Sequence, residues 1–150
     1  LSAQDQHIIM VISEFNLNIT ERLLIGAVNA YLHYYGVKKN LKVFRVPGAF
    51  EIPGTIQQII KHHSPNAIVA LGSVIRGETP HFDFVAGESA HGISELSRKM
   101  DFPIINGILT TDNVDQAIKR SEPSGRNKGW DSMETALQTI SVYCEIQTDI

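Results

Sequence analysis

Residues 67–81 read AIVALGSVIRGETPH and join a strand-like run to a polar loop. The run, residues 67–75, is almost continuously apolar, which is typical of a strand buried on both faces of a parallel sheet. The loop that follows holds an arginine, a glycine, a hydroxyl and a histidine. Because ligands of open α/β sheets bind just beyond the carboxyl ends of the strands, this stretch predicts both the sheet and a binding site.

The loop also has the features of an anion site. The residues from His81 onward have a helical pattern, so the loop lies near a helix N-terminus. Free amides of Gly77, Glu78 and Thr79, together with the positive end of the helix dipole, favour a bound anion there. His81 adds an imidazole, the side chain most often used for proton transfer. These features indicate chemistry on a phosphorylated small molecule.

Length and composition indicate one domain spanning residues 1–150. The apolar fraction of 43% and the charged fraction of 19% are ordinary for a globular protein of 150 residues. A net charge of -3 without a Lys/Arg run argues against nucleic-acid binding. No apolar run approaches the roughly 18 residues of a membrane span, and residues 1–4 do not resemble a signal peptide. We therefore expect a soluble, cytoplasmic domain with neither a nucleic-acid nor a membrane partner.

Metal and disulfide chemistry are not expected. The single cysteine, Cys144, cannot form an internal disulfide, and its apolar helical surroundings predict a packed thiol. The six histidines include no pair with a metal-ligand spacing such as H-E-x-x-H. The sequence therefore predicts no metal site.

Strands and helices alternate along the rest of the chain. Strands are predicted at residues 7–13, 41–46, 67–75 and 103–109. In the first helix, Asn18 and Glu21 match a capping box and Gly36 marks the end. Pro53 suits the first turn of the second helix, and further helices are predicted at residues 81–100, after a cap at Asp112, and at 128–145. This alternation predicts a parallel sheet with helices on both faces.

Four strand ends should meet at one edge of that sheet. This edge collects Phe15, residues 48–51, residues 73–81 and residues 106–111. Together they supply an aromatic ring, a carboxylate, an anion-binding loop and an imidazole. The convergence predicts a ligand pocket.

Several of these side chains also have a purely structural interpretation. Phe15 is followed by polar residues and is predicted to stack on a ligand ring, with ordinary core packing as the alternative. Glu51 lies in an apolar stretch, where it either binds polar groups of the ligand or complements a helix N-terminus. Arg76 either contacts the ligand or forms an ion pair with Glu51, Glu78 or Glu88.

Cations cluster late in the chain, at Lys119, Arg120, Arg126 and Lys128. Cations near a helix end are a common structural arrangement. The functional alternative is a second clamp on the phosphate, contributed by a neighbouring subunit.

Taken together, these segments resemble the lumazine synthase family, the 6,7-dimethyl-8-ribityllumazine synthases of riboflavin biosynthesis. The similar segments follow the family's order and cover nearly the whole chain: residues 15–16, 46–53, 71–83, 107–111, 116–120 and 127–129. The resemblance implies a flavodoxin-like three-layer α/β/α sandwich with a four-stranded parallel sheet. It also implies homopentamers with active sites between adjacent subunits.

The reaction implied by the resemblance has two small-molecule substrates. It condenses 5-amino-6-(D-ribitylamino)uracil with 3,4-dihydroxy-2-butanone 4-phosphate, giving 6,7-dimethyl-8-ribityllumazine, phosphate and water. This is the penultimate step of riboflavin biosynthesis, and it requires neither a metal nor another cofactor. The family forms either free pentamers or capsids of sixty subunits. Residues 121–126 lack the glycine-rich sequence of many capsid formers, which favours free pentamers.

The resemblance also implies roles for individual residues. Those expected to bind the pyrimidine and its ribityl chain are Phe15, Ala49, Glu51, Ser73, Val74, Ile75, Asn106 and Lys128. Phosphate would be held by Gly77, Glu78, Thr79 and the neighbouring subunit's Arg120, while His81 would transfer protons. Asn106 stands where many members carry phenylalanine, which implies looser stacking at that wall or altered product affinity.

Other functions of similar folds match the sequence less well. A flavin electron carrier needs a phosphate loop after its first strand, which residues 14–18 do not supply. A phosphorylation receiver needs an aspartate at the end of its third strand, where Ser73 stands. Neither G-x-G-x-x-G nor a Walker loop occurs. A flavin- or lumazine-binding protein or structural shell without catalysis stays open as the alternative, favoured only by Asn106.

Overall fold

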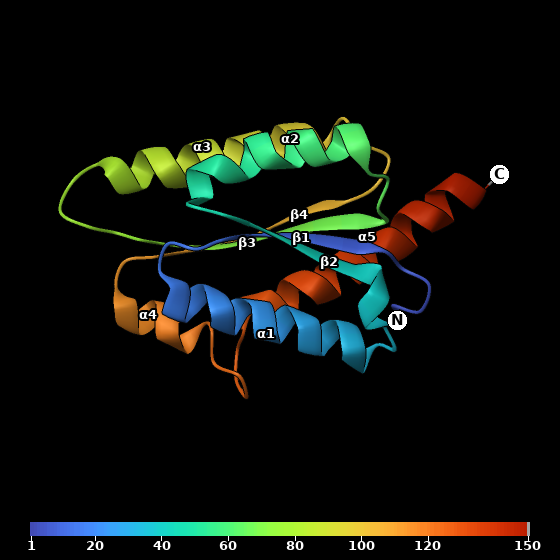
Figure 1. Ribbon diagram of the computed structural model, residues 1–150, viewed down its shortest axis with the longest axis horizontal. Helices are drawn as coiled ribbons and strands as arrows, with labels where there is room; N and C mark the ends of the chain where they lie inside the picture. Colours follow the sequence, from blue (N-terminus) through green and yellow to red (C-terminus); the bar gives the residue numbers. More distant parts are fainter. Residues whose placement is uncertain (150) are drawn as a thin grey trace.

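The computed structural model describes residues 1–149 and has three layers, a sheet between two layers of helices (Figure 1). The elements are, in order, β1 (Ile8–Ser13), α1 (Leu17–His33), η1 (Lys38–Asn40), β2 (Leu41–Val46), η2 (Ala49–Glu51), α2 (Ile52–His62), β3 (Ala67–Ile75), α3 (His81–Ser97), β4 (Ile104–Thr111), α4 (Val114–Lys119) and α5 (Lys128–Thr148). None of the helices formed by residues 1–149 is both long and apolar enough to cross a membrane.

The sheet contains four parallel strands in the order β2-β1-β3-β4. Ile8 of β1 lies opposite Leu41 of β2 on one side and Ala67 of β3 on the other. The pairing of β3 with β4 continues to the end of both strands, where Ile75 lies opposite Thr111. The expected parallel, three-layer α/β/α fold is confirmed, and all four carboxyl ends lie at one edge of the sheet.

Alternation along the strands distributes the buried apolar side chains between the two faces of the sheet. Ile8, Met10 and Ile12 of β1 pack in the core that includes α1 and α5. Ile9 and Val11 pack in the opposite core, which includes α2 and α3. In Figure 1 the helices α2 and α3 accordingly cover one face, while α1, α4 and α5 cover the other. Both faces of the central strands are therefore shielded from water.

The beginning of α1 differs from the prediction. The helix starts at Leu17 after Asn16, whose φ of 62° is left-handed and whose side chain forms no cap bond to the helix. Asn16 Nδ2 instead donates to the carbonyl of Ser73 at 2.8 Å. The capping box of Asn18 and Glu21 is therefore wrong, because Asn18 lies inside the helix and Glu21 forms an ion pair with Arg45.

The end of α1 also differs. The helix ends at His33, and Tyr35, rather than Gly36, adopts the left-handed conformation with φ of 70°. Gly36 has another role, because a Cβ built there would lie 2.3 Å from the ring of Tyr31. That ring is fully buried, and burial raises the pKa of its hydroxyl. The glycine is therefore required by packing on the tyrosine and not by backbone conformation.

Two predictions in the last third of the chain are wrong. The N-cap of α4 is Asn113, not Asp112, and its Oδ1 accepts from the amide of Gln116 at 2.9 Å. The thiol of Cys144 is exposed instead of packed. Its helix, α5, projects beyond the sheet in Figure 1, so this part of the helix has little to pack against. The remaining boundaries shift by up to three residues, with α3 ending at Ser97, β4 at Thr111 and α5 at Thr148.

Helices α1 and α5 approach so closely that a side chain is excluded at their contact. A Cβ on Gly129 would lie 1.8 Å from the carbonyl oxygen of Leu23. Nearby, Asn127 Nδ2 donates to the carbonyl of Arg22 at 3.2 Å, while its Oδ1 caps α5 by accepting from Trp130 N at 3.0 Å. This contact fixes the start of α5 against α1.

We expect Gly129→Ala to destabilise the protein by about 3 kcal/mol or more, because the backbones of α1 and α5 must separate to admit the methyl group. Urea unfolding at one fixed protein concentration measures the change. The matched control is Gly87→Ala in α3, where no atom lies within 4 Å of the added Cβ. This second change should stabilise by about 1 kcal/mol through helix propensity. Equal effects of the two substitutions would contradict the assigned contact.

Candidate active site

A cavity of about 610 Å³ opens at the carboxyl edge of the sheet. It is bounded by the turn after β1, by η2, by the end of β3 and by the start of α3. Nine of the residues predicted for the site line it: Phe15, Ala49, Glu51, Ser73, Val74, Ile75, Gly77, Thr79 and His81. Three of the four strand ends predicted to form the pocket therefore meet at this cavity within one chain, whereas the end of β4, at Thr110 and Thr111, lines a second cavity.

Two hydrogen bonds, one from the backbone and one from a side chain, hold the three strand ends at this cavity together. The amide of Phe15 donates to the carbonyl of Pro47 at 3.0 Å, which joins the ends of β1 and β2. The side chain of Asn16 joins the same turn to the carbonyl of Ser73 in β3. Phe15 is nevertheless 72% exposed, although exposing a large apolar side chain to water is unfavourable. An exposed ring on a fixed backbone is suited to stacking on a planar ligand.

The segment η2 forms another wall. Ala49 is buried, and its carbonyl accepts a hydrogen bond from Ser89 Oγ of α3 at 3.1 Å. Glu51 is the N-cap residue of α2, and its exposed side chain faces the cavity. Glu51 therefore lies at a helix N-terminus, as the structural interpretation requires, while its binding of ligand hydroxyls stays a prediction.

The anion loop is exposed and ends at His81. Residues 76–80 are exposed, and α3 begins at His81 without a side-chain cap from Pro80. Thr79 Oγ1 accepts from the amide of His81 at 3.4 Å, which is long for a hydrogen bond. Gly77, Thr79 and His81 line the cavity, whereas Glu78 does not. The imidazole therefore lies on the same short segment as the amides predicted to bind an anion.

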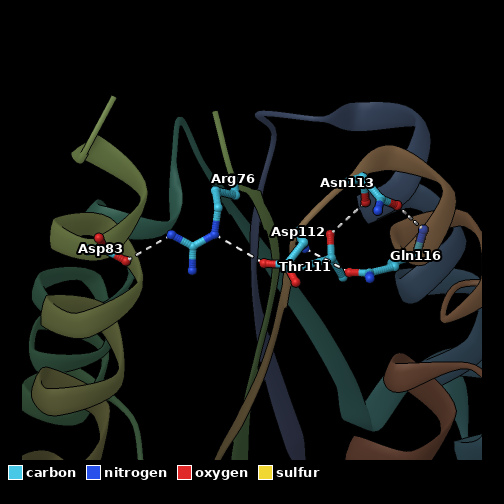
Figure 2. A network of polar contacts seen from close by, with 6 residues as sticks. All are labelled: Arg76, Asp83, Thr111, Asp112, Asn113 and Gln116. Carbon is cyan, nitrogen blue, oxygen red and sulfur yellow. Dashed lines mark hydrogen bonds and ion pairs between the residues drawn. The ribbon is translucent and has the colours of Figure 1, made fainter. Parts of the chain in front are cut away.

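The ion pairs of Arg76 differ from those predicted. Its guanidinium contacts Asp83 at 3.5 Å through Nη1 and Asp112 at 3.1 Å through Nε (Figure 2). Glu51, Glu78 and Glu88 are not its partners, so that part of the prediction is wrong. The carboxylates used instead come from the first turn of α3 and from the turn after β4.

A second cavity, of about 600 Å³, contains Arg120. Arg76, Asp112, Lys119 and Arg120 line it, and Phe82 lines both cavities. The second cavity therefore carries cations, while the first carries His81. In a single chain, Arg120 does not share a cavity with the imidazole.

Two further predicted residues line neither of these cavities. Lys128 is the first residue of α5, and Asn106 lies exposed on β4 at the edge of the sheet. Asn106 Oδ1 accepts from the amide of Ile108 at 3.0 Å. Their predicted contacts with the ring and the reacting groups are not formed within one chain.

Three aromatic residues of the first cavity were missed by the sequence reasoning: Phe50, Phe82 and Phe84. Phe50 and Phe84 are 56% and 65% exposed. Their positions in the sequence could have identified them, because Phe50 lies within residues 48–51 and Phe82 and Phe84 lie within three residues after residues 73–81. Within residues 1–149 no group of three His, Cys, Asp or Glu side chains is arranged to hold a metal ion.

Comparison with known proteins identifies the family. A family model described as 6,7-dimethyl-8-ribityllumazine synthase matches residues 5–143. A relative of that name from Chlorobium limicola is 40% identical over 143 residues, covering 95% of this chain and 92% of the relative. Relatives of the same name from Campylobacter hominis (92% of this chain, 88% of the relative) and Nautilia profundicola (95% and 92%) are each 41% identical, over 138 and 142 residues. The resemblance inferred from the sequence is confirmed, and the chain belongs to the 6,7-dimethyl-8-ribityllumazine synthase family.

Proposed function

We propose that this protein condenses 5-amino-6-(D-ribitylamino)uracil with 3,4-dihydroxy-2-butanone 4-phosphate to give 6,7-dimethyl-8-ribityllumazine, phosphate and water. Membership of the synthase family supports this reaction. The observation that carries the proposal is the single cavity that combines an exposed aromatic ring, a carboxylate, an anion loop and an imidazole. The ring, the carboxylate and the loop each suit a chemical group of one of the two substrates, and the imidazole suits proton transfer between them.

The pyrimidine substrate fits the apolar side of the cavity. Phe15 stacks on its ring, and the half-buried Val74 and Ile75 form the opposing wall with Ser73. Ala49 and Glu51 bind the hydroxyls of the ribityl chain, the first through its backbone and the second through its carboxylate. This arrangement leaves the reactive amine directed toward the anion loop.

The phosphate of the second substrate binds at the start of α3. The amides of Gly77, Glu78 and Thr79 supply hydrogen-bond donors, and the helix dipole favours the negative charge. Arg120 completes this site from a neighbouring subunit, a role supported by its place in a different cavity of its own chain. Lys128 and Asn106 reach the shared site in the same way.

The proposal therefore includes a cytoplasmic homopentamer, either free or assembled into a capsid. Large exposed apolar side chains support burial against other subunits; they include Leu17, Ile25, Val142 and Ile146. Light scattering measures the mass in solution, and a monomer that is fully active would contradict the shared site.

Chemistry at this site needs orientation more than it needs an unusual catalytic group. The amine and the ketone form a Schiff base, phosphate is eliminated, and the ring closes with loss of water. His81 lies beside the anion loop and transfers protons during these steps. One acid-base residue contributes about 3–5 kcal/mol, whereas holding two reactants in register contributes about 7–11 kcal/mol. Positioning is therefore the larger contribution.

Mixing the purified protein with both substrates tests the reaction directly. We expect the fluorescence of the lumazine to rise together with an equal amount of released phosphate. Omission of either substrate is the control. Binding of the lumazine without turnover would instead support the non-catalytic alternative.

We expect His81→Ala to lower kcat about 100-fold without abolishing the reaction, because positioning is retained when the imidazole is lost. Steady-state kinetics across a range of pH measures the effect. The matched control is His91→Ala, since His91 lies on the same helix as His81 but outside the cavity. Within residues 1–149 its single ion-pair partner is Glu95, at 3.9 Å. Complete inactivity of a well-folded His81→Ala assembly would contradict a mechanism dominated by positioning.

We expect Arg120→Ala to raise the KM for the phosphate substrate about 10- to 100-fold, the range for losing a hydrogen bond to a charged group. The KM for the pyrimidine should change little, because Arg120 is assigned to the phosphate alone. Arg126→Ala is the matched control, since Arg126 belongs to the same basic cluster but lines neither cavity. Equal loss of affinity for both substrates would contradict this assignment.

A further inference from the structure

Arg76 connects two elements that lie on opposite sides of the carboxyl edge of the sheet. Its Nη1 contacts Asp83 in the first turn of α3, and its Nε contacts Asp112 in the turn between β4 and α4 (Figure 2). Its backbone amide donates to the carbonyl of Thr111 at 2.9 Å, which continues the pairing of β3 with β4. The backbone of Arg76 is thus fixed by the sheet while its side chain spans the gap between α3 and α4.

The Asp112 end of this bridge is held by the turn around it. The amide of Asp112 donates to Gln116 Oε1 at 2.8 Å, and the amide of Gln116 donates to Asn113 Oδ1 at 2.9 Å. Thr111 Oγ1 also donates to the carbonyl of Asn113 at 3.0 Å. All of these contacts are drawn in Figure 2. The carboxylate that forms the ion pair with Arg76 therefore belongs to a turn held by three hydrogen bonds of its own.

The other end of the bridge has little support of its own. Residues 77–80 are exposed, Pro80 provides no side-chain cap for α3, and nothing lies within 4 Å of a Cβ built on Gly77. The guanidinium of Arg76 also covers the ring of Phe82, with Cζ 4.4 Å from the ring centroid. Its contacts with Phe82 and Asp83 are therefore side-chain connections that close the loop preceding His81.

We infer that Arg76 is a positioning residue, which holds the start of α3 so that the loop amides and His81 face the phosphate substrate together. The inference rests on the proposed function for the identity of that substrate. Arginine suits the role because its planar guanidinium can contact two carboxylates through different nitrogens while stacking on a ring. Both ion pairs are exposed, so they contribute little to the free energy of unfolding. Their main effect is on the orientation of the first turn of α3.

Kinetics of Arg76→Met test the role in substrate binding. The long apolar side chain of methionine still packs on Phe82 but cannot pair with either aspartate. We expect the KM for the butanone phosphate to rise about tenfold, while the KM for the pyrimidine and the thermal midpoint barely change. Arg76→Lys should behave similarly, because a single ammonium cannot span both carboxylates. Asp83→Asn and Asp112→Asn should each reproduce part of the effect.

The matched control is Arg98→Met. Arg98 lies at the opposite end of the same helix, where its Nη1 donates to Ser94 Oγ at 2.7 Å. We expect wild-type kinetic constants for this variant. A rise in both KM values together with a lower thermal midpoint in Arg76→Met would overturn the inference, because it would indicate a general structural role.

Amide hydrogen exchange gives a second measurement that does not depend on activity. In Arg76→Met we expect exchange in the first two turns of α3, residues 81–88, to accelerate about tenfold, with the rest of the helix unchanged. Arg98→Met should leave residues 81–88 unchanged. Unaltered exchange there in Arg76→Met overturns the inference whatever the kinetics. Accelerated exchange in a protein whose wild type makes no lumazine supports the positioning role and contradicts only the proposed reaction.

Discussion

Burial of β3 on both of its faces is the constraint on which the rest of the structure depends. Residues 67–71 have no exposed surface, because β3 pairs with β1 and β4 while helices cover it above and below. The centre of the sheet is the position at which all of these side chains are removed from water, and this removal is strongly favourable. Parallel pairing then brings all strand ends to one edge, where the turn after β1, η2 and the start of α3 enclose the cavity. The position of the site thus follows from the position of one strand.

The features predicted correctly from the sequence are those that depend on nearby residues or on regular periodicity. The strand at residues 41–46 and the strand at residues 67–75 have the predicted bounds. Features decided by distant partners were missed. Asn16 is held by the carbonyl of Ser73, and Arg76 pairs with Asp112, so neither could be assigned from local pattern. Cys144 is exposed because α5 extends beyond the sheet. This exposure depends on the length of α5 relative to the strands, which a local pattern does not give.

The candidate site divides in the same way. Phe15, Glu51 and His81 follow or adjoin predicted strands, and the topology alone brings them to one cavity. Arg120 follows a short helix and lines a separate cavity, so the role proposed for it in the reaction requires a second copy of the chain. A pattern within one sequence indicates which residues share an edge of a sheet. It does not indicate which surfaces of two copies meet.

The ring of Phe82 is a wall of both cavities and also the surface on which Arg76 lies. A mutation that changes the size of this side chain alters the shape of both cavities at once. A substitution at this position therefore couples the geometry of the cavity that holds His81 to the geometry of the cavity that holds Arg120.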